Sequence, residues 1–372
     1  MSLGTGLRTL FLSVVLAGVG MSSDFSEVPT PVTPTVDGSG NRIWTRAFES
    51  EPFLIDQIHR SMEGPKSVSR VKITHGDVDE FLWLLSYETK IVEASTGEVL
   101  SDEYMCHNNA NFQDLAKHRE IIGAKPVRGP RRLFTLSQGV MGVDFPKGFG
   151  IPFRTSEPIS VNTQVLNLNP VEEGLNVRYR TTVSYAVDSQ LVEKIKPLYQ
   201  FGLMGLKITK GDKGYPGEAN PDPEEHGESC SVGEVAESGK EFPLADGNTY
   251  IKHWVVEPGR EENHTLVTPR LGLREDVKVH YISVHLHPYA ESLELRDLTA
   301  QKTIFKSHAT NHKDRIGLRQ VESYSSTEGL TLFKDHEYSL ISVYDNDSGE
   351  QQDAMASMFL YMADAGFGDT RQ

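Results

Sequence analysis

The chain has 372 residues, of which 38% are hydrophobic and 24% charged, so it has enough apolar surface for a packed core and lacks the composition of a disordered or membrane-spanning protein. Because single hydrophobic cores rarely grow beyond about 250 residues, this length predicts two domains. The formal net charge of −15 excludes nucleic acid as an expected partner, since phosphate backbones are bound by a surplus of Lys and Arg.

The N-terminus is typical of a secretory signal peptide. Arg8 precedes an apolar run from Leu10 to Met21, and small residues follow it. The run is too short to span a bilayer, which requires about 20 helical residues. We therefore expect residues 1–23 to be a signal peptide and the protein to be secreted or periplasmic, with no membrane span. A buried N-terminal helix or an uncleaved anchor is the alternative. Residues 24–43, rich in Pro, Thr and Gly, are expected to form a flexible lead-in.

The pattern of residues 44–205 predicts a first β domain. Short segments of alternating polar and apolar residues, broken by turn residues, are typical of half-buried strands. The expected strands are Phe81–Leu85, Val140–Phe145, Ser160–Leu168 and Asn176–Val187. Two short helices are expected as well, at Asp56–Met62 and Gln190–Tyr199.

Residues 206–249 are dense in Gly, Pro, Asp and Glu, which predicts a long loop or linker at the domain junction. Strands return in residues 250–366, at Tyr250–Val256, Lys278–Leu286, Ser292–Asp297, Tyr338–Tyr344 and Ala354–Met362. The whole pattern predicts an all-β fold of two antiparallel β-sandwich, jelly-roll-like domains in tandem.

A His-x-His pair lies in one of these strands. Residues two apart on a strand project from the same face, so His285 and His287 can reach one metal ion together. His280 has the opposite parity and is expected to point away unless a bulge intervenes. Imidazole pairs suit copper, zinc or iron, and a surface or packing pair is the alternative interpretation.

The last strand is rich in methionine. Met355, Ser357, Phe359 and Tyr361 are expected on one face, and Met358 with Met362 on the other. Most of these methionines are expected to fill a core. A thioether beside two imidazoles is nevertheless a soft ligand set that selects copper rather than magnesium or calcium.

The order of these motifs resembles the ascorbate-dependent type II copper monooxygenases, the family of peptidylglycine α-hydroxylating monooxygenase and dopamine β-monooxygenase. The resemblance rests on Val284-His285-Leu286-His287, Val343-Tyr344-Asp345 and Asp353-Ala354-Met355, where Ala354 replaces the family's Glu. Val255-Val256-Glu257-Pro258-Gly259 is similar to the family's strand at the start of its C-terminal domain.

What the resemblance implies is an oxygen-activating copper held by His285, His287 and Met355. It also implies hydroxylation of a C–H bond in a small-molecule or peptide substrate, with ascorbate as an external reductant.

The family's second copper site is incomplete in this sequence. Its His-His pair corresponds to Met105-Cys106-His107-Asn108, and its third ligand corresponds to Leu166. Leucine cannot bind a metal, and His118 is the one nearby candidate to assist. We expect this electron-storage site to be lost and His107 to be its remnant.

Three interpretations remain open at this stage. The first is a copper-dependent monooxygenase-like enzyme with a single mononuclear copper. The second is a non-catalytic copper-binding protein for storage, sensing or delivery. A purely structural β protein with incidental histidines is a third. The two cysteines, Cys106 and Cys230, are expected either to pair or to be free thiols.

Overall fold

The computed structural model describes residues 25–28, 33–127, 131–171, 174–210, 242–243 and 247–368. The predicted signal peptide and Cys230 lie outside these residues. Within them, no helix is long and apolar enough to cross a membrane.

The fold is all-β, as predicted, and its first half is a sandwich of two sheets. One layer has the strand order β3-β12-β6-β10, and the other has the order β5-β11-β7-β8. The strands of the first layer are β3 (Arg42–Glu49), β12 (Leu175–Val187), β6 (Phe81–Glu93) and β10 (Phe149–Arg154). Those of the second are β5 (Lys66–Lys72), β11 (Pro158–Val165), β7 (Met105–Phe112) and β8 (Arg132–Leu136). Alternate residues of β12 are buried because every second side chain faces the opposite layer.

Three local expectations in this half were wrong. The lead-in is not wholly flexible, because β1 (Ser26–Val28) and β2 (Thr35–Val36) both pair with β3. Residues 56–62, after β4 (Phe53–Ile55), contain a bend, an isolated bridge from His59 to Asn167 and the start of a turn instead of a helix, and β4 itself pairs with β12. Residues 190–199 contain the end of the short 3-10 helix η2 (Asp188–Gln190) and the start of β13 (Lys196–Met204) instead of an α-helix. Pro197 in this segment lacks the N–H that a helix interior requires.

One helix in this half was missed by the sequence analysis. It is α1 (Leu115–Ile121), and the Asp114 side chain caps its N-terminus by accepting a hydrogen bond from the Lys117 N–H at 3.0 Å. A second short helical segment, η1 (Asp102–Tyr104), precedes β7.

The second half is also a sandwich. One layer contains β13, β17 (His253–Val256), β25 (Gln352–Ala363), β19 (Val277–Leu286) and β23 (Tyr324–Leu332). The other contains β18 (Gly259–Leu266), β24 (Tyr338–Asn346), β20 (Ala290–Asp297), β21 (Lys302–Asn311) and β22 (Leu318–Val321). The second half also contains the short helix α3 (Thr268–Leu271) and a small sheet of β14 (Lys207–Lys210), β16 (Thr249–Ile251) and β15 (Phe242–Pro243). The short strand β9 (Gly142–Asp144) belongs to the first half, where it pairs with β6.

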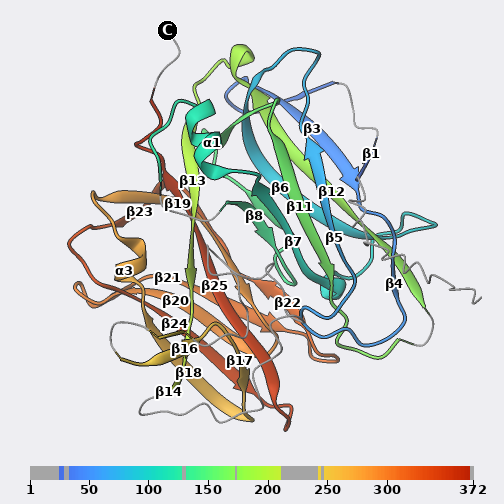
Figure 1. Ribbon diagram of the computed structural model, residues 1–372, viewed down its shortest axis with the longest axis vertical. Coiled ribbons are helices and arrows are strands. Elements are labelled where there is room, and N and C mark those ends of the chain that lie inside the picture. The colour runs from blue at the N-terminus through green and yellow to red at the C-terminus, as the bar shows by residue number, and fades with distance from the viewer. Residues whose placement is uncertain are drawn as a thin grey trace, which may run out of the picture.

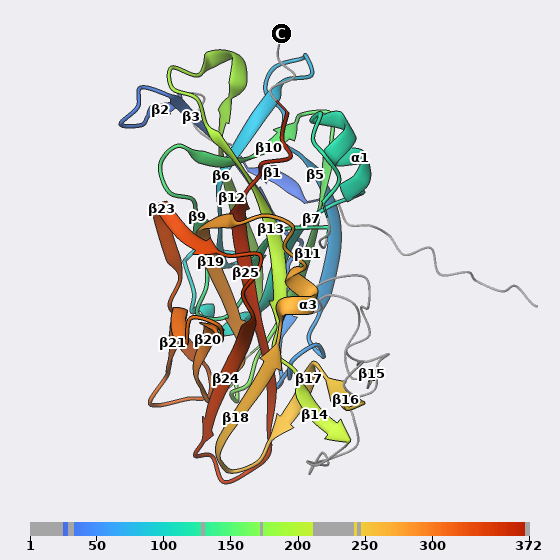
Figure 2. The same ribbon diagram turned by 90° about the vertical axis from the view of Figure 1, so that its left-hand side faces the viewer.

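The two halves lie side by side, the first at the upper right and the second at the lower left of Figure 1, and they share one continuous sheet (Figure 1; Figure 2). The connection is a short parallel pairing of β10 with β13, whereas the other ladders among the described strands are antiparallel. β13 then pairs with β25 as far as Met204 opposite Ser357, and β17 continues along the same edge with His253 opposite Met355. The predicted division at residue 205 stays a prediction, but the pairing places β13 in the sheet of the second half.

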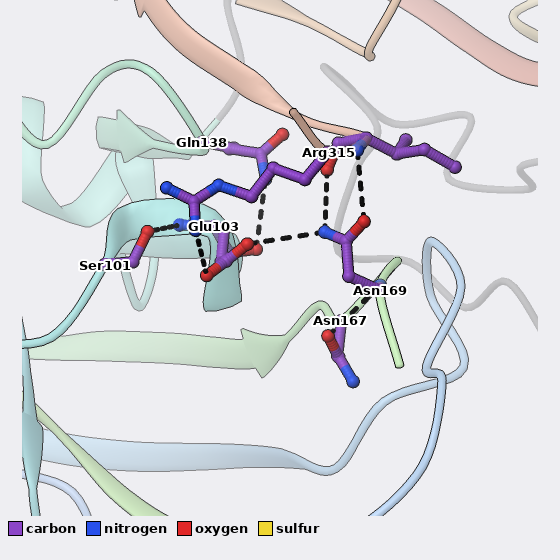
Figure 3. A network of polar contacts seen from close by, with 7 residues as sticks. Ser101, Glu103, Gln138, Asn167, Asn169 and Arg315 are labelled. Atoms are coloured by element: carbon purple, nitrogen blue, oxygen red, sulfur yellow. Dashed lines mark hydrogen bonds and ion pairs between the residues drawn. The ribbon is translucent and has the colours of Figure 1, made fainter. Parts of the chain in front are cut away.

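A network of polar contacts also connects the halves (Figure 3). The Asn169 amide donates to the Ile316 carbonyl at 2.9 Å and accepts from the Ile316 N–H at 3.0 Å. Gln138 spans the same junction, donating to the Glu103 carbonyl at 3.0 Å and accepting from the Leu318 N–H at 2.8 Å. These contacts fix the position of the β21–β22 loop against the first half.

Candidate metal centre

Strand β25 separates two cores, and its residues alternate between them. Met358, Leu360 and Met362 pack into the core between the two sheets of the second half. Met355, Phe359 and Tyr361 face the other way and pack with residues of the first half. The predicted division of the methionines between two faces is therefore confirmed.

The His-x-His pair lies on the same face as Met355. The ladder between β19 and β25 places His285 opposite Ser357 and Leu286 opposite Ala356, so the next position in register sets His287 opposite Met355. Side chains directly opposite each other in an antiparallel pair share a face of the sheet. The ring centroids of His285 and His287 are 5.1 Å apart.

A third histidine, His253 on β17, joins this group from the other side of β25. Its Cα atom is the ladder partner of Met355. Strands that flank a common neighbour are about 9.5 Å apart, yet the ring centroids of His253 and His287 are separated by 5.2 Å. The two rings therefore lean toward each other over the position of Met355, which is 1% exposed.

Asp353 lies two residues before Met355 on the same face of β25 and contacts two of the imidazoles. Its Oδ1 atom is 2.5 Å from Nε2 of His253, and its Oδ2 atom is 3.1 Å from Nδ1 of His287. Loss of water raises the pKa of Asp353, but the two imidazoles outweigh this effect and hold the pKa well below its usual range. The carboxylate is therefore ionised at neutral pH.

The protonation of His285 differs from that of His287. Burial, reinforced by His287 and His107, lowers the pKa of His285 well below its usual range, so the ring is neutral at neutral pH. Burial also lowers the pKa of His287, but the Asp353 carboxylate outweighs it and raises that pKa overall. Each of the two residues is 6% exposed.

His285 provides the observation that most favours a metal. Neither of its ring nitrogens has a hydrogen-bond partner among the described residues, although both atoms are buried. A buried imidazole without partners loses its hydrogen bonds to water and gains nothing in exchange, which costs about 1–3 kcal/mol. A metal ion at this position would satisfy one of the two nitrogens, and neutral imidazole is the form that binds metals.

The backbone of the centre is held by Tyr344 on β24. Its hydroxyl donates to the Met355 carbonyl at 2.5 Å and accepts from the His287 N–H at 3.3 Å. Both residues therefore have a common anchor from the opposite sheet of the second half.

The first half covers the centre. His107 and Arg132 are close enough to influence the pKa of His285, and Cys106 that of His287. Cys106 is buried. His107 itself is buried opposite Gln164 in the ladder between β7 and β11.

The other candidates for the second copper site have different surroundings. Leu166 is part of the hydrophobic core. His118 contacts Glu157 at 3.1 Å and stacks on Phe112 with ring centroids 3.9 Å apart, so its surroundings are structural. The predicted loss of the electron-storage site and the status of His107 as a remnant remain predictions.

His280 lies at a bulge in β19, where the register with β25 shifts between Val279 and Tyr281. Its ring stacks on Phe149 with centroids 4.0 Å apart, and its Nδ1 atom is 3.0 Å from the Ser326 carbonyl oxygen. It is thus engaged away from the His285–His287 pair.

Sequence reasoning missed His253 and the role of Asp353. The predicted strand Tyr250–Val256 is divided in the structure into β16 and β17, which belong to different sheets, and His253 is the first residue of β17. Its pairing partner on β25 is about a hundred residues away in the chain. Asp353 is part of the motif in the last strand, and because it is two residues from Met355 it projects from the same face of that strand. This shared face is the signal that could have identified it as a residue of the centre. Ligand atoms of His253, His287 and Asp353 all lie within 4.8 Å of one another.

No protein-family model and no curated protein matches this sequence. Among solved structures, the chain is similar to the STIV MCP, at 8% identity and a TM-score of 0.30, over 87% of this chain and 99% of that chain. It is also similar to recombinant peptide:N-glycanase F (PNGase F), at 8% identity and a TM-score of 0.34, over 86% of this chain and 96% of that chain. Likenesses of this size identify no family and no activity.

Proposed function

We propose that this protein binds a single copper ion through His285, His287 and Met355 and acts as a monooxygenase-like oxidoreductase. The observation that carries the proposal is the buried His285 ring, whose nitrogens have no hydrogen-bond partner among the described residues. This ring lies beside the imidazole of His287, and the thioether of Met355 is on the neighbouring strand. Two imidazoles and one thioether form a soft set that favours Cu⁺ over harder ions.

The chain's own residues prepare this ligand set. Asp353 contacts Nδ1 of His287, which leaves Nε2 of that ring as its metal-binding atom and fixes the orientation of the ring. Tyr344 holds the main chain at both His287 and Met355. The strands that carry the ligands are hydrogen-bonded neighbours, so the ligands are positioned before any ion binds.

Copper, when bound, supplies one-electron redox chemistry with dioxygen. The reaction that the sequence resemblance implies would insert one oxygen atom into a substrate C–H bond and reduce the other to water, with two electrons and two protons from ascorbate. The substrate would be a small molecule or a peptide.

A non-catalytic copper-binding protein is the second candidate, and one observation favours it. His285 and His287 are each 6% exposed, and the face of β25 beside them packs with residues of the first half. Such burial suits retention of an ion and restricts the approach of a large substrate.

The test of copper binding is anaerobic titration of the full chain with Cu⁺ against a chromogenic chelator. We expect one ion per chain, and an affinity at least about 100-fold lower for His285→Ala, a loss beyond that expected for an outer-sphere contact. Met358→Leu, on the opposite face of β25, is the matched control for Met355→Leu. Wild-type affinity in both His285→Ala and Met355→Leu would refute the site.

Oxygen consumption separates the two candidates. Copper-loaded protein, freed of unbound ion, is mixed with ascorbate and dioxygen, and His285→Ala treated in the same way is the control. Consumption that requires His285 supports the oxidoreductase. Tight copper binding without such consumption supports storage or delivery.

A further inference from the structure

The centre contains a second group of ligand atoms that overlaps the first. His253, His287 and Asp353 present ligand atoms within 4.8 Å of one another, and both carboxylate oxygens of Asp353 face imidazole nitrogens. None of the sequence motifs that predict copper includes His253. The group comes from two neighbouring strands, β17 and β25, and from the residue after β19.

The chemistry of this group differs from that of the copper set. Two imidazoles and one carboxylate offer nitrogen and oxygen atoms, which suit Zn²⁺ and other divalent first-row ions better than Cu⁺. The Asp353 side chain is 35% exposed although its Oδ2 atom is buried, so an ion that enters from solvent can reach the carboxylate.

His287 belongs to both groups. Its Nδ1 atom faces Asp353, and its ring lies between those of His253 and His285, at 5.2 Å and 5.1 Å. A neutral imidazole has one lone pair on one nitrogen, so it can bind one ion at a time. The two groups therefore compete for this residue.

We propose that the centre contains two mutually exclusive metal sites that share His287: a soft site of His285, His287 and Met355 for Cu⁺, and a hard site of His253, His287 and Asp353 for a divalent ion such as Zn²⁺. The soft site rests on the proposed function, whereas the hard site does not. The choice between them is set by the softness of the ion.

The competing explanation is that Asp353 only orients His287 as an outer-sphere partner. In that case, removal of the Asp353 charge would lower the affinity for every metal that binds to His287, and it would do so to a similar degree for each metal. A comparison of two metals in the same variants distinguishes the explanations.

The experiment measures Zn²⁺ affinity with a fluorescent indicator and Cu⁺ affinity anaerobically with a chromogenic chelator, in the full chain. We expect Asp353→Asn to lower the affinity for Zn²⁺ by about tenfold or more and the affinity for Cu⁺ by about threefold or less. Met355→Leu should give the reverse pattern. His287→Ala should weaken both, and Zn²⁺ should compete with Cu⁺ for the wild-type protein. His253→Gln provides a second variant of the hard site if Asp353→Asn does not fold.

An equal loss of Zn²⁺ and Cu⁺ affinity in Asp353→Asn would overturn the two-site proposal. Simultaneous binding of one Zn²⁺ and one Cu⁺ would overturn it as well. Cu⁺ binding without any Zn²⁺ binding would also overturn it and leave the proposed function intact. Zn²⁺ binding that Asp353→Asn weakens, without any Cu⁺ binding, would refute the proposed function and overturn the two-site proposal. The hard site would then be the single metal site of the centre.

Discussion

At the residue scale, the Tyr344 hydroxyl has a role that its position in the sequence did not reveal. It is buried between the two layers of the second half and bonds to main-chain groups of both His287 and Met355. Burial raises the pKa of Tyr344 far above its usual value, so the hydroxyl keeps its proton and donates to the Met355 carbonyl at every physiological pH. It therefore fixes the spacing between two ligand-bearing strands.

We expect Tyr344→Phe to lower both stability and metal affinity. Loss of the hydroxyl leaves a buried carbonyl and a buried N–H without their partner, which costs about 1–3 kcal/mol in the free energy of unfolding. Cu⁺ affinity should fall about tenfold because the supporting contact of two ligands is lost. Urea unfolding of the metal-free protein and chelator competition measure the two effects.

Tyr338→Phe is the matched control. The Tyr338 hydroxyl is also buried in the second half, and it bonds to the N–H and carbonyl of Phe333, away from the centre. This variant should lose similar stability and retain Cu⁺ affinity. Equal loss of affinity in both variants would show that Tyr344 acts only through global stability.

The residues of the centre were only partly predictable. The His285–His287 pair follows from strand parity, whereas Met355 as its companion was implied by the family resemblance, and the structure places all three on one face of one sheet. His253 and Asp353 required the register between β17 and β25. That register is set by long-range hydrogen bonding and core packing, which no local pattern in the sequence encodes.

At the element scale, β25 shows how a period of two divides one strand between packing and chemistry. Met358 and Met362 face the core of the second half, whereas Asp353 and Met355 face the first half. A methionine stripe in a strand is therefore informative only when its two faces are considered separately.

The two faces predict opposite effects of mutation. Met358→Ala should lower the free energy of unfolding by about 2–4 kcal/mol because it leaves a cavity in a packed core. Its Cu⁺ affinity should stay within about threefold of wild type, since the side chain points away from the centre. Met355→Leu nearly conserves volume and should cost less than about 1.5 kcal/mol, while Cu⁺ affinity falls.

Thermal unfolding and chelator competition on the same preparations measure both quantities. A loss of Cu⁺ affinity in Met358→Ala as large as that in Met355→Leu would mean that the strand responds as a unit. The thioether would then have no special role.

At the scale of the whole molecule, the fold class was accessible from the sequence and the junction between the halves was not. Alternation and turn spacing predicted an all-β fold, because they are local consequences of the strand period. The place of β13 depends on pairing with β10 on one side and β25 on the other, which lie far away along the chain. The single sheet that joins the halves therefore emerged only from the structure.

The polar junction of Figure 3 should control access to the centre, because the first half lies over the histidines. Asn169 makes two hydrogen bonds to the main chain of Ile316 and a third, at 3.3 Å, to the Glu103 carboxylate. We expect Asn169→Ala to weaken the junction by about 1–3 kcal/mol.

Cys106 reports on this opening, since it is 5% exposed, directly precedes His107 on β7 and is close enough to His287 to influence its pKa. In a Cys230→Ser background, Asn169→Ala should speed thiol labelling of Cys106 roughly tenfold if the halves separate about 1.4 kcal/mol more easily. Asn162→Ala is the matched control, because that amide lies on β11 and bonds within the first half to Ser160. Equal acceleration in both variants would show that labelling follows unfolding of the first half, and the junction would not then gate the metal centre.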